Sequence, residues 1–334
     1  MKSIDVVIPN YNYAHYLKNC VDSVRNQPAE RLRILIIDNA STDDSAAVAR
    51  MLASVDPRIE LMLRPKNLGA HASFNDGIDW AQSDYFLILC SDDYLAPGAL
   101  ARAMAFMEDN RDVHLVHGKT HFRANNTEGD GLLDNPLPSD WSKQDGMSFL
   151  KSLCQSGRNF VSGPTAIVRT AIQKKVGYYK PALIHTDDLE MWLRFALHGA
   201  VGRTENIQAV ARVHDFNQSA TVRTLEQWSI EFEAAFQSFF ENDGAILTDA
   251  DVLLRQARNA LSERAYWSAV AQLCRGEPEA MALMRHAIKL RPSAAWLPPL
   301  RYLLRRSDAS ALIGRSVKAL GRRLGTSTTP DGRL

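Results

Sequence analysis

Short apolar runs alternate with amphipathic stretches over the first 120 residues. The apolar runs are rich in β-branched residues, and between them apolar positions recur at helical spacing. This alternation predicts βαβ units, and right-handed crossovers then make a doubly wound α/β domain with a mostly parallel central sheet the simplest fold. The strands are predicted at Ile4–Ile8, Arg33–Ile37, Ile59–Leu63, Tyr85–Leu89 and Val113–Val116, and the helices near His15–Asn26, Asp44–Ala53, Ala70–Ala81 and Pro97–Glu108.

Polar, turn-forming residues follow four of these predicted strands directly. They are the segments Pro9–Asn12, Asp38–Asp43, Arg64–Asn67 and Cys90–Asp93. One such segment alone is ordinary turn chemistry. Ligands of open parallel sheets bind outside the carboxyl ends of the strands, so four polar ends together favour a binding crevice at this edge.

The pattern changes after residue 120. Residues 125–143 are rich in Gly, Pro, Asn and Asp and predict a loop or lid. Short helices then alternate with strands near Thr165–Arg169 and Ile207–His214, and from Leu225 to Gly325 nearly all of the chain has helical spacing. We therefore expect one domain over residues 1–224, divided into a nucleotide-binding half (1–120) and an acceptor half (121–224), followed by a helical C-terminal region (225–334).

Composition and charge narrow the class of protein. The chain has 334 residues, is 46% hydrophobic and 23% charged, and carries a formal net charge of only +1, so nucleic acid is not an expected partner. The four cysteines form no CxxC pair, which argues against a disulfide framework or a zinc site. The sequence has no apolar stretch of the length of about 18 residues that a membrane span needs, and its N-terminus lacks a signal-peptide pattern. These features predict a cytoplasmic protein.

Asp92 and Asp93 are adjacent acids at the end of an apolar strand. Two neighbouring carboxylates are costly there unless a cation lies beside them, and their hard oxygen ligands suit Mg²⁺ or Mn²⁺. The alternative is that one of them caps a helix beginning near Pro97. Taken alone, the pair does not decide between these two roles.

Five motifs, in order along residues 4–221, together resemble family 2 glycosyltransferases. The resemblance implies a GT-A fold, a divalent metal ion and an inverting transfer of a sugar from a nucleoside diphosphate, with uridine as the expected base. The motifs are Val6–Asn12 with His15–Leu17, Asp38–Ser45, Asn67–Gly69 through Asn75–Ile78, Ser91–Asp93 and Thr186–Arg194.

The resemblance assigns a nucleotide pocket to the first three strand ends. Pro9, Tyr11 and Asn12 would form it together with Asp38, which would accept a hydrogen bond from the base, or would instead be a solvated turn residue. Asn67 would complete the pocket. Lys66 either joins Asn67 there or is merely solvated.

The resemblance also assigns the reacting groups. Asp92 would face the ribose or diphosphate, and Asp93 would ligate the metal ion. His214, in a late loop, would be a second ligand or a structural residue paired with a carboxylate. Cys90 stands where many family members have an acid, which puts metal affinity in doubt. Asp188 would be the base that inversion requires, with the cap of its own helix as the alternative.

The C-terminal tail carries a separate charge. From Gly276 onward it bears +7, which leaves −6 on the rest of the chain. Leu312, Val317 and Leu320 recur at helical spacing with basic residues between them, so this helix is expected either to pack on its own domain or a second subunit, or to lie on the inner membrane surface. The second role would suit a lipid-linked acceptor, and a glycan is the other acceptor expected.

Two alternative functions remain open from the sequence. A nucleotidyltransferase that makes sugar nucleotides would want a glycine-rich, basic loop after the first strand, which residues 9–16 do not provide. A non-catalytic sugar-nucleotide-binding protein would keep the same fold and the same pocket. Substitution of Asp188 separates an enzyme from such a binding protein.

Overall fold

A computed structural model describes residues 2–124, 140–214 and 217–299. The predicted loop at residues 125–143 falls largely outside these ranges, and the predicted basic helix at residues 312–324 lies wholly outside them. The chain divides into two compact units, one of residues 1–151 and 159–220 and the other of residues 152–158 and 221–334. The units are described separately.

The first half of the first unit is a parallel sheet, as predicted. Its strands are apolar on both faces, since Ile4, Val6, Val7 and Ile8 are all fully buried, which is typical of a parallel sheet covered on both sides. The strands are β1 (Ser3–Asn10), β2 (Arg31–Asp38), β3 (Ile59–Leu63) and β4 (Tyr85–Ile88), and their order is β3-β2-β1-β4.

The second half of the sheet mixes parallel and antiparallel pairs. Two short strands, at 94–95 and 142–144, were not predicted, and the last strand begins at Ala200 rather than near Ile207. The sheet continues from β4 through β8 (Ile167–Arg169), β6 (Val113–Ala124) and β9 (Ala200–Val213) to β5 (Tyr94–Leu95), while β7 (Ser142–Gln144) pairs with β9. Within the described residues β6 and β9 are parallel, whereas β8 is antiparallel to both β4 and β6.

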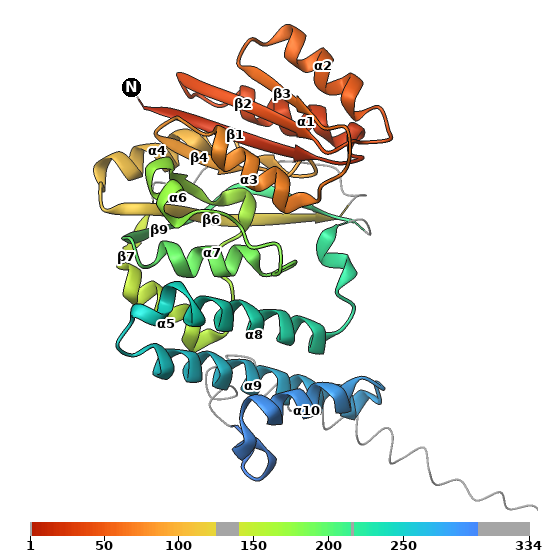
Figure 1. Ribbon diagram of the computed structural model, residues 1–334, viewed down its shortest axis with the longest axis vertical. Helices are drawn as coiled ribbons and strands as arrows, with labels where there is room; N and C mark the ends of the chain where they lie inside the picture. Colours follow the sequence, from red (N-terminus) through yellow and green to blue (C-terminus); the bar gives the residue numbers. More distant parts are fainter. Residues whose placement is uncertain (1, 125–139, 215–216, 300–334) are drawn as a thin grey trace, which may run out of the picture. The chain divides into compact units, whose positions relative to one another are not determined.

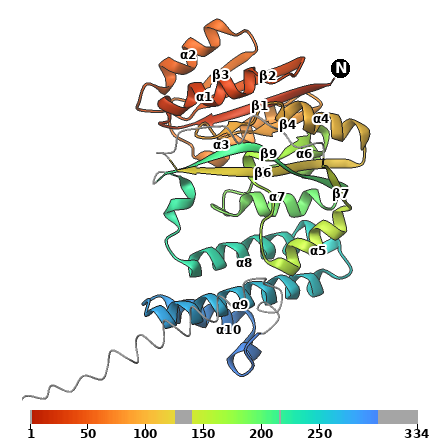
Figure 2. The ribbon, with the colours of Figure 1, turned by 180° about the vertical axis from the view of Figure 1, so that it is seen from behind.

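Helices cover both faces of the sheet (Figures 1 and 2). Alternate residues of a strand point to opposite faces, so Val6 and Ile8 join the core beneath the first, second and fourth helices, while Val7 faces the third. The helices are α1 (Ala14–Arg25), α2 (Ser45–Val55), α3 (Ala70–Trp80), α4 (Ala99–Asp109), α5 (Gly146–Ser156), α6 (Thr170–Val176) and α7 (Asp187–Phe195), with a 3₁₀ turn η1 (Gly163–Thr165).

The second unit is helical in its described part. Thr224 and Gln227 form a reciprocal capping box that begins its first long helix, and Gly276, with φ of 76°, ends the second. In the described residues no helix is both long and apolar enough to cross a bilayer. The helices are α8 (Leu225–Glu241), α9 (Ala250–Arg275) and α10 (Ala280–Leu290), with 3₁₀ turns at Asp243–Ile246 and Pro292–Ala295. Another 3₁₀ turn, Gln218–Thr221, begins in the first unit and ends at the first residue of this segment of the second.

Candidate active site

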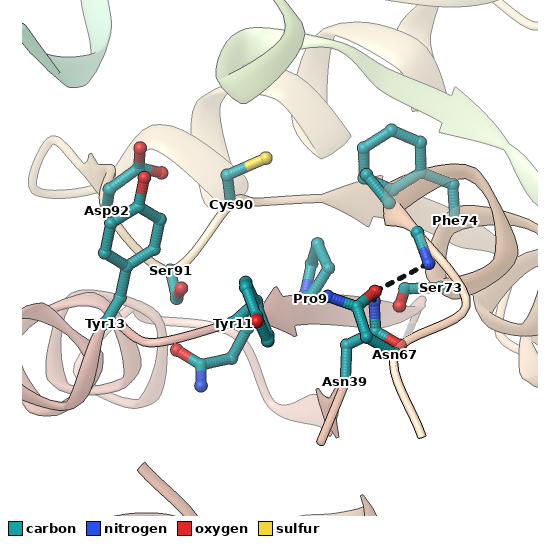
Figure 3. Close-up of a pocket in the computed structure, with 13 residues that line it drawn as sticks. Pro9, Tyr11, Tyr13, Asn39, Asn67, Ser73, Phe74, Cys90, Ser91 and Asp92 are labelled. Atoms are coloured by element: carbon teal, nitrogen blue, oxygen red, sulfur yellow. Dashed lines mark hydrogen bonds between the residues drawn. The ribbon is translucent and has the colours of Figure 1, made fainter. Parts of the chain in front are cut away.

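A cavity of about 260 Å³ opens where β1, β2 and β4 end. Tyr11, Asn39 and Cys90 are among the side chains arranged around it in Figure 3. Its position at the carboxyl ends of parallel strands is the usual ligand position in open α/β sheets. The lining residues are Pro9, Asn10, Tyr11, Tyr13, Asn39, Asn67, Gly69, Ala70, Ser73, Phe74, Cys90, Ser91 and Asp92.

Asp38 organises the floor of this crevice without lining the cavity. The parallel register places it opposite Asn10, whose amide donates a 2.9 Å hydrogen bond to Asp38 Oδ1. The same oxygen accepts from the Ser41 hydroxyl at 2.6 Å, and Oδ2 accepts from the Ser41 backbone N–H at 3.0 Å. Asn12, with φ of 59°, joins this turn by accepting from the Thr42 N–H at 2.7 Å. Asp38 and Asn12 therefore hold the loops that carry the pocket walls.

Asn39, the next residue, does line the cavity. Its Oδ1 accepts from the Arg64 guanidinium at 3.0 Å and from the Leu68 N–H at 2.9 Å, and its Nδ2 donates to Asn67 Oδ1 at 2.7 Å. Arg64 also donates to Ser73 at 3.2 Å and forms an ion pair with Asp76. The amide of Asn39 is thus fixed by three neighbours, which makes it a preorganised wall for a planar ligand.

Asp92 and Asp93 meet the end of β9 beside the cavity. His214 Nε2 lies 3.3 Å from Asp92 Oδ2, and the Arg212 N–H donates to Asp93 Oδ1 at 3.2 Å. The Arg212 guanidinium lies over the rings of Tyr16 and Tyr94, at 4.7 and 4.6 Å from their centroids, and donates to the Asp92 carbonyl at 2.5 Å. Both acids are buried, and this burial raises the pKa of each carboxyl. For Asp93 the charge of Asp92 raises the pKa further.

The donor set at this point fits a hard divalent cation. Two buried carboxyl groups with raised pKa values are stabilised in their charged forms by a cation, and an imidazole lies against one of them. In the part of the chain that the structure describes, no three His, Cys, Asp or Glu side chains are arranged as a metal cage. Mg²⁺ in particular is commonly held by one or two carboxylates, several waters and the phosphates of a substrate rather than by a cage of side chains.

A second acidic pair, Asp187 and Asp188, begins α7. Asn159 donates a 2.7 Å hydrogen bond to Asp188 Oδ2, and the Leu189 N–H donates to Oδ1 at 2.7 Å. Burial, and next the charge of Asp187, raises the pKa of Asp188 to about 7. A carboxylate with that pKa accepts a proton readily near neutral pH, as a general base must. Asp187 itself is paired with His71, whose Nε2 lies 3.1 Å from Asp187 Oδ2.

The two acidic pairs lie around common neighbours. Burial raises the pKa of Cys90, and the charges of Asp92, Asp93 and Asp187 all add to that effect. Burial likewise raises the pKa of Tyr179, with added contributions from Asp187, Asp188 and Cys90. Tyr179 also contacts Phe74, a cavity-lining residue, at 5.3 Å between ring centroids. The acids after β4 and one acid of α7 thus lie close enough to Cys90 to affect its ionisation, and both acids of α7 affect that of Tyr179.

The predicted site residues divide into two groups. Pro9, Tyr11, Asn67 and Asp92 line the cavity, whereas Asp38 and Asn12 lie behind it and Lys66 is exposed to solvent. Asp93 and His214 lie beside Asp92, and Asp188 is the second residue of α7; these three residues do not line the cavity. Asn39, Arg212 and His71 were not among the predicted site residues. The sequence nevertheless offered a signal for each of these residues. Asn39 and His71 lie within two of the motifs, and Arg212 lies two residues before His214.

Residues 5–177 match the sequence profile of the family described as Glycosyl transferase family 2, and the chain belongs to this family. It is similar to an uncharacterized glycosyltransferase of Haemophilus influenzae, with 34% identity over 122 residues. That match covers 36% of this chain and 48% of the relative, so the chain spans about half of the relative's length.

Solved structures of similar fold are GT-A glycosyltransferases. TarS of S. aureus (residues 1–349), in complex with UDP-GlcNAc, superposes with a TM-score of 0.62 at 16% identity, covering 97% of this chain and 92% of that one. A mannosyltransferase of Pyrobaculum calidifontis, in complex with GDP-Man and Mn²⁺, superposes with a TM-score of 0.53 at 18% identity, covering 96% and 87%. The fold of this chain is therefore GT-A with additional C-terminal helices.

Proposed function

We propose that the protein is an inverting, metal-dependent glycosyltransferase that transfers a sugar from a nucleoside diphosphate, UDP-linked, to a hydroxyl group of an acceptor. One observation carries the proposal: a cavity at the strand ends adjoins two acidic pairs, one suited to a cation and the other to a proton. The complexes of the structural neighbours with UDP-GlcNAc and with GDP-Man and Mn²⁺ support a nucleoside diphosphate donor.

In this proposal the cavity holds the nucleoside, with the Asn39 amide and the Tyr11 side chain as its walls. The carboxylates of Asp93 and Asp92 and the imidazole of His214 would hold Mn²⁺ or Mg²⁺ near the diphosphate. When bound, the ion stabilises the negative charge that develops on the departing diphosphate. Asp188 takes the proton of the acceptor hydroxyl, and the Asn159 amide holds the carboxylate that does so. Attack opposite the leaving group inverts the anomeric carbon.

We further propose a cytoplasmic location and a role in assembling a surface polysaccharide or another glycoconjugate, with a glycan or a lipid-linked acceptor. The family membership supports the reaction class. The lipid-linked acceptor is proposed from the predicted basic helix at residues 312–324, which lies outside the described residues. Flotation of the full chain and of a chain ending at residue 299 with anionic liposomes tests the tail directly.

The test of the function is release of nucleoside diphosphate from a panel of UDP-, GDP- and dTDP-sugars with Mn²⁺ and candidate acceptors. A transferase consumes one donor faster when its acceptor is present, and Asp188→Asn loses this turnover while it keeps nucleotide affinity. A nucleotidyltransferase would instead form sugar nucleotides from nucleoside triphosphates and sugar phosphates. A binding protein would retain nucleotide affinity and show no turnover with any donor.

A further inference from the structure

His71 connects the wall of the cavity to the acidic pair on α7. It lies in the first turn of α3, between the cavity-lining Ala70 and Ser73. Its imidazole Nε2 is 3.1 Å from Asp187 Oδ2, and both side chains are only 13% exposed. Its ring also meets the cavity-lining Phe74 at 5.9 Å between centroids. A largely buried contact of this kind restrains both partners, unlike a surface ion pair.

The position of the Asp187 carboxylate, which His71 contacts, matters for the adjacent Asp188. Asp188 follows it in the same turn, and the charge of Asp187 is the second largest cause of the raised pKa of Asp188, after burial. Two adjacent carboxylates in one enclosed site lose their protons as a coupled pair, so the orientation of one sets the proton affinity of the other. A polar group held against one oxygen of Asp187 therefore influences Asp188 without touching it.

We propose that His71 is a positioning residue for Asp188: with its Nε2 3.1 Å from Asp187 Oδ2, it restrains that carboxylate and sets the electric field at the neighbouring acid. The inference rests on the proposed role of Asp188 as base. It also ties α3, which forms one wall of the cavity, to the helix that carries this base. His71 would be neither a nucleotide contact nor the base itself.

Several other groups surround the Asp187–Asp188 pair. Asn159 donates to Asp188 from the segment before η1, and it carries no charge. Asp187 and Asp188 both raise the pKa of Tyr179, whereas Arg194 lowers it. The titratable or charged groups around the pair are thus His71 from α3, Cys90 from the end of β4, Tyr179 from the segment before α7, and Arg194 from α7 itself.

Two substitutions separate the polar contact from packing. His71→Phe keeps an aromatic ring against Phe74 but removes the imidazole nitrogens, and His71→Gln keeps a polar group of similar reach but removes the ring. The readout is the ¹³C NMR titration of aspartate carboxyl groups, with the Asp188 signal identified by its loss in Asp188→Asn. This readout follows the carboxyl group whether or not the chain transfers sugar, so failure of the proposed function is seen separately as absent turnover.

We expect His71→Phe to raise the pKa of Asp188 by about one unit, since an unheld Asp187 carboxylate turns its charge toward Asp188. His71→Gln should stay close to the wild-type value. No shift in either variant, or a shift in His71→Gln that His71→Phe lacks, would overturn the proposal. Should His71→Phe fail to fold, His71→Ala in comparison with His71→Gln gives the same contrast.

Discussion

His214 Nε2 lies 3.3 Å from Asp92 Oδ2, which brings the segment after the last strand of the sheet against the acids that follow β4. The imidazole is enclosed by Tyr13 and Tyr16, with ring centroids at 5.3 and 5.6 Å. In the proposed function, His214 would share a cation with these acids.

Removal of the metal ion should weaken binding of a nucleoside diphosphate. With excess chelator we expect the dissociation constant to rise by about tenfold or more, the scale seen when support for a metal site is lost. Asp93→Asn should show the weaker affinity even with Mn²⁺ present. Isothermal titration with and without Mn²⁺ measures both effects, and Lys66→Ala, at an exposed position, is the matched control. Equal affinities in all conditions would contradict a metal-held diphosphate.

Asp188→Asn should abolish transfer while sparing donor binding. General base catalysis contributes roughly 10²–10⁴-fold, so we expect kcat to fall by that order while the affinity for the nucleoside diphosphate changes little. Steady-state turnover and calorimetry on the same preparation separate these two quantities. Retained turnover in the variant would remove Asp188 from the mechanism.

The activity should rise with pH through about 7. Burial and the charge of Asp187 raise the pKa of Asp188 to about 7, and a base accepts a proton only when it is ionised. The acidic limb of kcat/KM should therefore have its midpoint near pH 7. Asp187→Asn removes the like charge and should move that midpoint to lower pH. A limb near pH 4 in the wild type would mean that the group is not enclosed as described.

The same pKa has a consequence for stability. Because the folded state holds the Asp188 proton more tightly than the unfolded chain does, stability falls as pH rises from about 4 to about 7. The asparagine of Asp188→Asn has no carboxyl group to ionise. This variant should therefore melt at a higher temperature than the wild type at pH 8. At pH 4 the difference should disappear. Thermal unfolding at both pH values measures this, and a difference of the opposite sign would contradict it.

Gly77 permits the close packing of α3 on β1. A Cβ atom at this position would lie 2.7 Å from Val7 Cγ1, which is closer than real Cβ contacts allow. We expect Gly77→Ala to cost about 1–3 kcal/mol of unfolding free energy, as overpacking of a tight core does. Gly163→Ala is the control, because a Cβ there meets nothing within 4 Å. Denaturant unfolding compares the two, and equal costs would show that α3 moves aside freely.

The first half of the sheet could be predicted because its signals are local. Each of its strands is a continuous apolar run followed by an amphipathic helix, and β3 was predicted with its observed bounds. The second half depends on pairing between distant residues. Tyr94–Leu95 is too short to show a strand period, and its partners Val210 and Ala209 lie far along the chain. Periodicity alone cannot indicate such strands.

The candidate site was predicted to the level of segments but not always of side chains. Each motif was placed at a strand or helix end, but Asp38 and Asn39 are adjacent and only one of them lines the cavity. Which of the two lines the cavity depends on the strand register, because Asn10 lies opposite Asp38 and donates a hydrogen bond to its carboxylate. His71 was missed for a similar reason, because its partner Asp187 is on a different helix.

Arg212 joins three segments that are far apart in the sequence. Its guanidinium donates to Asn19 of α1 at 2.6 Å and to the Asp92 carbonyl, and it lies over the rings of Tyr16 and Tyr94. A chimaera that takes β9 from a relative would therefore keep Tyr16, Asn19 and Tyr94 but could lose the arginine that contacts them. An exchange of β9 must carry positions 16, 19, 94 and 212 together.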